Sequence, residues 1–264
     1  MAFSFDEVAK FENTVWSRCA PGYREGFEAL TGNALKPLLD AVNVRKGERV
    51  LDLGCGPGTV SAAAQERGAS CVGVDFSDAM VGEARRRNPG IDFKTGDVHA
   101  LPFGDAEFDV VIANLVVHHL GDPDRALKEA QRVLKPGGRL AFTVWADMTK
   151  LEAFGLFFGA VAEHGNAGEL PHGPLFGVSD FDVYRTMVKK AGFSDSTVRE
   201  VPIAWKTDSI DSYLKAFSDW AAMDTFPKAT ADAIRTSVRT KAEAYRKGSG
   251  FEIPNPVILV FAIK

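Results

Sequence analysis

The sequence predicts an α/β fold, a doubly wound and mostly parallel sheet with helices on both faces. Short β-branched runs alternate with helical patterns between about residues 48 and 145, and this alternation is typical of parallel strands joined by helical crossovers. A tight glycine turn directly follows the first strand, and Asp75 ends the second. Both features lie where sheets of this kind bind ligands, at the carboxyl ends of the strands.

The elements follow from local patterns. The expected strands of the core cover residues 48–53, 70–75, 91–95, 108–113 and 138–145. One helix is expected to begin near Thr59, and another is expected to have Asp122 as its N-cap, Pro123 at its first position and two glycines beyond its end. Outside the core, helices are expected over 32–41 and 179–191, and strands over 197–205 and 257–263.

The glycine turn indicates a nucleoside-bearing ligand. Residues 50–58 read VLDLGCGPG, and Gly54, Gly56 and Gly58 let the backbone approach a ligand closely, while the helix that follows directs its positive end into the same space. A dinucleotide fingerprint requires glycine at the sixth position of the turn, where this chain has Thr59. A nicotinamide-dependent oxidoreductase is therefore the less favoured alternative.

The turn and four later segments together resemble the motifs of one enzyme family. The matching segments are D-x-G-x-G-x-G (52–58), VGVDFS (72–77) with Met80, GDV (96–98), FDVVIAN (108–114) and LKPGG (134–138). In this order and spacing they resemble the class I S-adenosylmethionine-dependent methyltransferases, in particular the ubiquinone/menaquinone-biosynthesis-like branch with small-molecule substrates. The resemblance implies S-adenosylmethionine as cofactor and a Rossmann-like sheet of seven strands, completed by an antiparallel pair from 197–205 and 257–263.

The resemblance also implies which residues bind the cofactor. Gly54, Cys55 and Gly56 would form the turn that runs close to the amino-acid tail of the cofactor. Asp52 would accept a hydrogen bond from the amino group of this tail, directly or through water. Asp75 would accept from both ribose hydroxyls.

The rest of the implied cofactor site lies on later motifs and on the N-terminal segment. Its residues are Phe76 and Met80 beside the sugar and adenine, Asp97 and Val98 at the adenine edge, Asn114 and Leu115 at the methionine part, and Trp16 and Tyr23 in a leading segment that shields the cofactor. Asp97 could instead cap a turn. Trp16 and Tyr23 could instead pack against the sheet edge.

Two adjacent histidines follow the fourth strand, beside the expected methyl position. A hydroxyl or carbon nucleophile must lose a proton during methyl transfer, and imidazole titrates near neutral pH. Adjacent helical residues point about 100° apart, so only one of His118 and His119 is expected to face the pocket, and His119 is the preferred base. The alternative is a packing role. His99, His164 and His172 are interpreted as surface or loop residues.

The whole chain, 1–264, is expected to form a single methyltransferase domain. Its expected parts are an N-terminal helical cover (1–47), a cofactor-binding core (48–145), a lid insertion (146–178) and the C-terminal part of the sheet (179–264) with a helical insertion (208–250). The insertions are rich in aromatic residues, most of which should pack internally while two or three touch the acceptor. The candidates are Phe154, Phe157, Phe158, Phe176, Tyr213, Phe217, Trp220 and Phe226, together with Met223.

Composition excludes several functional classes. The net charge of −4 lacks the basic excess of a nucleic-acid-binding protein, and Asn114 is not followed by the Pro-Pro-aromatic sequence of enzymes that methylate base amines. No apolar run approaches the roughly 20 residues that span a bilayer. Three unpaired cysteines and no clustered metal ligands indicate a reduced, cytoplasmic protein without a metal.

The sequence therefore predicts metal-free methyl transfer to an O- or C-nucleophile of an apolar or aromatic small molecule. The other class kept open is a non-catalytic or regulatory protein that binds S-adenosylmethionine. Exposed aromatic residues on the insertions could also serve a homodimer.

Overall fold

The computed structural model describes residues 3–165 and 170–264. Residues 1–2 of the expected cover and 166–169 of the expected 146–178 insertion lie outside this part. A seven-stranded sheet has the order β3-β2-β1-β4-β5-β10-β6. Its strands are β1 (Arg49–Leu53), β2 (Ser70–Asp75), β3 (Asp92–Thr95), β4 (Phe108–Asn114), β5 (Leu134–Trp145), β6 (Ser196–Val201) and β10 (Val257–Ile263). β10 runs antiparallel to β5 and β6, which confirms the predicted fold.

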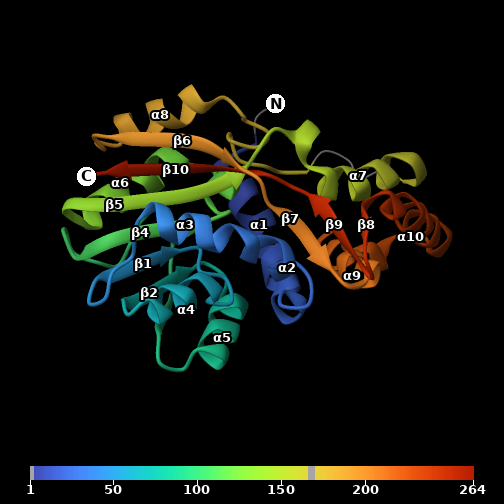
Figure 1. Ribbon diagram of the computed structural model, residues 1–264, viewed down its shortest axis with the longest axis horizontal. Helices are drawn as coiled ribbons and strands as arrows, with labels where there is room; N and C mark the ends of the chain where they lie inside the picture. Colours follow the sequence, from blue (N-terminus) through green and yellow to red (C-terminus); the bar gives the residue numbers. More distant parts are fainter. Residues whose placement is uncertain (1–2, 166–169) are drawn as a thin grey trace.

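Helices cover both faces of this sheet (Figure 1). The covering helices are α3 (Leu35–Ala41), α4 (Thr59–Glu66) and α5 (Asp78–Arg87) on one face, and α6 (Pro123–Val133) and α8 (Phe181–Lys190) on the other. Successive residues of a strand point to opposite faces: in β1, Val50 packs into the core on the α3 side and Leu51 into the core on the α6 side. Because both faces are buried, the inner strands are mostly apolar.

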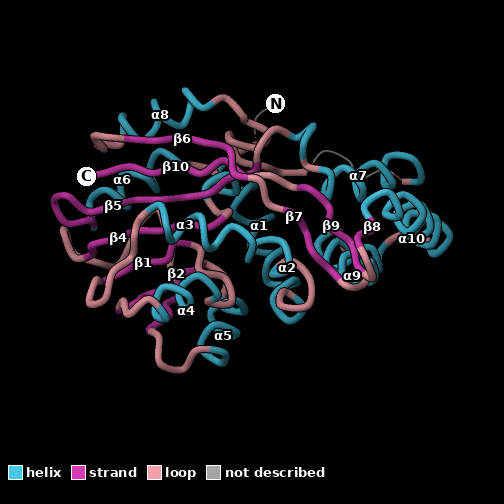
Figure 2. Tube along the Cα trace, viewed as in Figure 1, coloured by secondary structure: helices cyan, strands magenta, loops and turns pink. Residues whose placement is uncertain are grey.

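A second group of elements lies beyond one end of the main sheet (Figure 2). It contains a three-stranded sheet of β7 (Ala204–Thr207), β9 (Gly250–Pro254) and β8 (Arg246–Lys247), with α7 (Glu152–His164), α9 (Ile210–Trp220) and α10 (Lys228–Ala242). The chain's C-terminus lies at the opposite end of the main sheet (Figure 1). Since β10 runs antiparallel to the other long strands, their carboxyl ends face this second group.

Two predictions about these segments were wrong. The expected strand 197–205 is two strands, because β6 ends at Val201 and β7 begins at Ala204 in the other sheet. Pro202 lies between them and has no N–H to continue a ladder. The insertion 208–250 is not purely helical, since β8 lies near its end.

The N-terminal segment forms α1 (Phe5–Cys19) and α2 (Glu28–Thr31), which lie between the main sheet and the second group (Figure 1). A capping box starts α1: the Ser4 side chain accepts from the Glu7 N–H, and the Glu7 carboxylate accepts from the Ser4 N–H. Two contacts then hold α1 in place. Ser17 Oγ lies 2.9 Å from Ser77 Oγ beside the end of β2, and the Arg18 guanidinium donates to two carbonyls at the C-terminus of α9.

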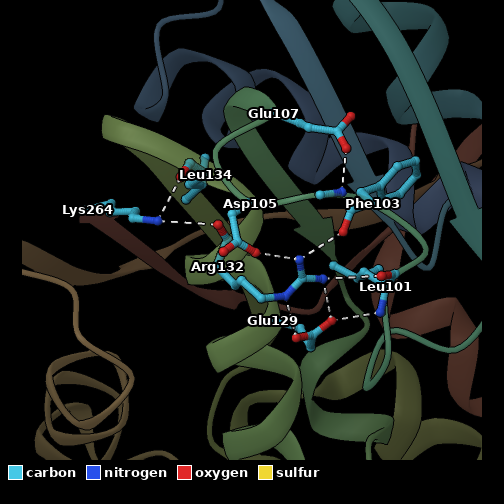
Figure 3. Close-up of polar contacts among 9 residues, drawn as sticks. Leu101, Phe103, Asp105, Glu107, Glu129, Arg132, Leu134 and Lys264 are labelled. Atoms are coloured by element: carbon cyan, nitrogen blue, oxygen red, sulfur yellow. Dashed lines mark hydrogen bonds and ion pairs between the residues drawn. The ribbon is translucent and has the colours of Figure 1, made fainter.

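A polar network fixes the loop between β3 and β4 against α6 (Figure 3). The Arg132 guanidinium donates to the carbonyls of Leu101 and Phe103 and pairs with Glu129, which itself accepts from the Leu101 N–H. These bonds hold the loop that follows β3 in place.

Asp122 caps α6 as expected, accepting from the Arg125 N–H at 3.0 Å. The following strand, β5, begins four residues earlier than the expected 138.

Candidate functional site

A cavity of about 1020 Å³ lies at the carboxyl ends of β1, β2 and β4. Its walls come from three places: the strand ends with Gly54 and Asp75, α1 with Glu12, and the second group with Phe158 and Trp220. Pockets for small molecules usually measure about 300 to 1,000 Å³. The cavity is therefore large enough for a nucleoside cofactor together with a second small molecule.

The glycine turn is closely packed at one position and open at another. A Cβ at Gly54 (φ +61°) would lie 2.5 Å from Cγ2 of Val116, so only glycine fits there. A Cβ at Gly56 (φ +50°) would meet no atom within 4 Å, and this residue lines the cavity. The backbone at Gly56 therefore forms an open cradle on the cavity wall.

Asp75 lies where the sequence placed it, at the end of β2 and on the cavity wall. Its two carboxylate oxygens accept from the N–H groups of Gly56 and Ser77, each at 2.9 Å. Burial raises the pKa of Asp75 to about 6, so the carboxylate is ionised at neutral pH. An ionised carboxylate has further lone pairs beyond these two bonds, so Asp75 can accept additional hydrogen bonds from a ligand in the cavity.

Two residues of the expected cofactor set, Asp52 and Cys55, do not line the cavity. Asp52 is buried behind the turn, where it accepts from Ser61 Oγ of α4 at 2.7 Å. Burial raises its pKa to about 7. Cys55 packs in the core on the α3 side of the sheet. Both residues therefore support the glycine turn from behind and do not face the cavity.

The expected adenine side of the site lies together. Phe76, Met80, Asp97 and Val98 all line the cavity. Asp97 also caps a turn, because its carboxylate accepts from the His99 N–H at 2.9 Å and lies 2.6 Å from His99 Nδ1. Both interpretations of Asp97 are thus compatible with its position.

His99 lies in a loop, as one of the two expected alternatives, but its side chain is buried on the cavity wall and not at the surface. Asp97 holds the ring of His99 inward. The ring of Phe5 from α1 packs edge-on against this ring, with centroids 4.9 Å apart. The sequence could not reveal this, because the covering residue is 94 positions away in the chain. His164 and His172 lie at exposed positions, although His172 also borders the cavity.

Asn114 and Leu115 lie at the end of β4 and line the cavity. The side-chain amide of Asn114 donates to the Thr31 carbonyl at 3.1 Å and accepts from Thr143 Oγ1 at 2.7 Å. This side chain is thus engaged with both α2 and β5. Leu115 has φ +58°, a strained conformation for a leucine, and it turns the chain toward the two histidines.

Both histidines line the cavity, so the expectation that only one would face it was wrong. They lie on a 3₁₀ turn, Val117–His119, with ring centroids 4.1 Å apart, and the cavity extends around this turn. His118 is 4% exposed, and in the described part of the chain neither of its ring nitrogens has a hydrogen-bond partner. Burial lowers the pKa of His118 well below the usual value, so this ring is neutral at neutral pH.

His119 has a partner that the motif analysis missed. Its Nδ1 lies 2.9 Å from Oε1 of Glu12 in α1. A signal was present in the sequence, since Glu12 lies within the buried stripe of α1, in line with Val8, Val15 and Cys19. A charged residue in the apolar stripe of a helix requires a polar partner.

The two aromatic residues expected to cover the cofactor, Trp16 and Tyr23, both line the cavity. Trp16 Nε1 donates to Oε2 of Glu12 at 2.8 Å, and the Tyr23 hydroxyl donates to Thr31 Oγ1 at 3.2 Å. Burial raises the pKa of Tyr23 to about 12, so its hydroxyl stays protonated.

The remaining wall of the cavity is apolar. The large hydrophobic side chains exposed in the described ranges are Phe5, Phe76, Met148 and Phe176, and all four line this cavity. The residues of the expected insertions divide into two sets. Phe154, Phe158, Phe176 and Trp220 line the cavity, whereas Phe157, Tyr213, Phe217 and Met223 are buried in the core and Phe226 packs against it.

Across residues 3–165 and 170–264, no three His, Cys, Asp or Glu side chains gather as a metal ion would require. Every helix in these ranges is too short or too polar to cross a bilayer.

Comparison with known proteins agrees with this geometry. Residues 51–142 match the family described as "Methyltransferase domain". A demethylmenaquinone methyltransferase of Renibacterium salmoninarum is 41% identical over 112 residues, which are 42% of this chain and 47% of that protein. A malonyl-[acyl-carrier protein] O-methyltransferase of Enterobacter lignolyticus is 37% identical over 131 residues, 50% of this chain and 52% of that protein. The matches thus span about half the length of these relatives.

The likeness extends further at the level of the fold. The YcgJ protein of Bacillus subtilis shares 20% identity and a TM-score of 0.58, covering 88% of this chain and 98% of that one. Such a likeness shows the same fold. Residues 51–142 form a methyltransferase domain, and the sequence is similar to class I S-adenosylmethionine-dependent methyltransferases of the quinone-biosynthesis type.

Proposed function

We propose that this protein transfers the methyl group of S-adenosylmethionine to an O- or C-nucleophile of a small apolar or aromatic molecule, without a metal. The observation that carries the proposal is the composition of the cavity. It joins the open Gly56 cradle and the Asp75 carboxylate at one end to aromatic side chains and the histidine pair.

The cofactor would supply an electrophilic methyl group on a sulfonium. Gly54 and Gly56 would shape the cradle for its amino-acid tail, and Asp75 would bind the ribose hydroxyls. The other proposed contacts are Phe76, Met80, Asp97 and Val98 around the sugar and adenine, the backbone of Asn114 and Leu115 near the methionine part, and Trp16 and Tyr23 as cover. Asp52 and Cys55 would act from behind the turn.

The acceptor would bind beneath the two insertions. We propose that 146–178 and 208–250 act as a lid over a core of 48–145, and that 1–47 covers the cofactor, all within one domain. Phe154, Phe158 and Trp220 provide the aromatic surface on the acceptor side. An aromatic wall buries flat, apolar ligands well, and it excludes water that would compete with the acceptor.

His119 is the proposed base, because it lines the cavity and retains partial exposure. Its role would be to take the proton of the acceptor's nucleophilic group. His118, a buried and neutral ring whose centroid lies 4.1 Å from that of His119, would support the base from beside it.

The proposal also covers partners and location. The exposed apolar side chains of the described residues line the cavity, which favours a small ligand over a homodimer as their partner. The net charge of −4 does not favour a nucleic acid. The three cysteines are buried free thiols, a state that the reducing cytoplasm maintains.

Calorimetric titration tests the cofactor site. The wild type should bind S-adenosylmethionine and S-adenosylhomocysteine at micromolar concentration and should not bind NADH, while Asp75→Asn should lose the sulfur nucleosides. Asp92→Asn on the neighbouring strand β3 is the matched control, because this exposed residue lies away from the cavity lining. Failure of the wild type to bind either sulfur nucleoside would overturn the proposal.

A second experiment separates an enzyme from a binding protein. Methyl-labelled S-adenosylmethionine is incubated with a set of apolar phenols and carbon acids, and product is sought by mass spectrometry. Transfer by the wild type that is lost in His119→Gln supports catalysis. Binding without transfer to any member of the set favours the non-catalytic alternative.

A further inference from the structure

Helix α1 contributes an acidic side chain to the histidine pair. Glu12 Oε1 lies 2.9 Å from His119 Nδ1, and Glu12 Oε2 accepts from Trp16 Nε1 at 2.8 Å. The ring of Trp16 packs edge-on against that of His119, with centroids 5.4 Å apart. Three side chains thus hold one another at the cavity wall, two from α1 and one from the turn after β4.

The carboxylate of Glu12 is in an unusual position for a charge. The residue is 6% exposed, and burying a carboxylate is costly unless it is paired. Among the residues that the structure describes, His119 is the only basic side chain within 4.0 Å of it. Both carboxylate oxygens have a donor, so the arrangement fixes the direction of each bond.

We propose that Glu12 is a positioning residue that holds His119 with its proton on Nδ1 and its bare Nε2 toward the acceptor. The proposal rests on the methyl transfer proposed above. A carboxylate only accepts hydrogen bonds, so a neutral His119 bonded to it must carry its proton on Nδ1. Nε2 is then the nitrogen that can accept a proton from a molecule in the cavity.

The step can be written with its atoms and electrons balanced. The proton of the acceptor's O–H or C–H group moves to His119 Nε2, and the electron pair left on the nucleophilic atom forms the bond to the methyl carbon. The bond between that carbon and sulfur breaks, and its electron pair stays on sulfur. His119 becomes an imidazolium, whose charge the carboxylate of Glu12 balances, as the aspartate of a catalytic triad does.

The other charged and titratable groups around His119 are compatible with this role. His118, at 4.1 Å between ring centroids, is neutral because burial lowers its pKa, so it adds no competing charge. The remaining titratable side chains on the cavity wall are Lys10, Tyr23, Asp75, Asp97, His99 and His172. Within the described part, Glu12 alone among acidic residues pairs with His119.

The tautomer of His119 can be measured without an acceptor. Full-length protein carrying ¹⁵N-labelled histidine, saturated with S-adenosylhomocysteine, gives ring-nitrogen NMR spectra in which protonated and bare nitrogens differ widely in shift. His119→Gln assigns the signal. We expect a bare Nε2 and a protonated Nδ1 for neutral His119 in the wild type. Glu12→Gln should shift the population toward the form with the proton on Nε2, while Asp6→Asn, an exposed acid on the same helix, should leave it unchanged.

The tautomer itself separates positioning from a purely structural contact, because lost packing alone would not move the proton from one ring nitrogen to the other. A wild-type signal with the proton on Nε2, or a tautomer unchanged in Glu12→Gln, would overturn the proposal. Absence of S-adenosylhomocysteine binding by calorimetry would instead refute the proposed function, so the two failures are distinguishable.

Discussion

The carboxylate of Asp75 accepts a hydrogen bond from the backbone N–H of Gly56 at 2.9 Å, which joins the end of β2 to the turn after β1. The parallel pairing of the two strands, with Leu53 opposite Val74, brings these positions together. Asp75 therefore orients the turn as well as facing the cavity. Because Asp75 has both roles, a substitution of this residue should affect ligand binding and also the stability of the fold.

Asp52→Asn should change how stability depends on pH. The pKa of Asp52 is about 7 in the folded protein and near 3.8 when the group is in water. Between these values the folded state holds a proton that the unfolded state has released, so stability from this group is fully present below pH 3.8 and is lost as pH rises to 7. The wild type should thus lose stability relative to Asp52→Asn over this range, by on the order of 4 kcal/mol.

Urea unfolding of ligand-free protein at several pH values measures this difference. Asp40→Asn is a control of opposite sign, because hydrogen bonds from Lys36 and Arg67 lower the pKa of that exposed carboxyl. Its contribution is present at neutral pH and lost as the pH falls. A difference between wild type and Asp52→Asn that is constant with pH would contradict the assignment of Asp52 as a buried acid.

Gly54→Ala and Gly56→Ala should behave differently. Both have positive φ, so each alanine costs about 1 to 2 kcal/mol of backbone strain, but only the Cβ at position 54 would collide with Val116. Gly54→Ala should therefore be clearly the less stable in thermal unfolding. Adding Val116→Ala should recover part of the loss in Gly54→Ala and none in Gly56→Ala. Equal stability of the two single variants would refute the packing argument.

Phe157→Ala and Phe176→Ala should separate core packing from the cavity wall. Phe157 is fully buried, and its truncation should destabilise the protein by about 3 to 5 kcal/mol. Phe176 is 51% exposed, so its truncation should change stability by less than about 0.5 kcal/mol. We expect Phe176→Ala to weaken binding of 1-naphthol, an apolar hydroxyl probe, measured by fluorescence. Unchanged naphthol binding would remove Phe176 from the acceptor wall.

Arg18→Gln should loosen α1. The Arg18 guanidinium donates to the carbonyls of Asp219 and Trp220 at the C-terminus of α9, where a positive charge also interacts favourably with the helix dipole. Its loss should raise hydrogen exchange in α1 and weaken S-adenosylhomocysteine binding severalfold, because α1 covers the cavity. Arg24→Gln, at an exposed position beyond α1, is the control. Identical exchange in the two variants would show that Arg18 does not hold α1.

Much of the site could be predicted because its signals are local. The turn at Gly54 to Gly58, Asp75 at a strand end and the Asp122 cap each depend on a few neighbouring residues. Parallel strands place their carboxyl ends at one edge of a sheet, so residues that follow different strands could be expected to meet. Asp75, Asn114 and the histidines do so.

The errors arose where one segment packs on another distant in the chain. His99 is buried because Phe5 covers it, and His118 and His119 both line the cavity because the cavity extends around their turn. The end of β6 at Val201 depends on which sheet the next residues join. No local pattern contains this information.

The sequence by itself indicated the alternating strands and helices of the core, the glycine turn and the resemblance of its motifs to methyltransferases, since periodicity, turn chemistry and motif spacing are properties of short segments. Only the tertiary structure decided that Glu12 lies against His119, 107 residues away, and that Asp52 lies behind the glycine turn rather than in the cavity. The contact of Glu12 with His119 depends on how α1 docks between two groups of elements. That docking follows from the burial of whole surfaces rather than from any single run of residues.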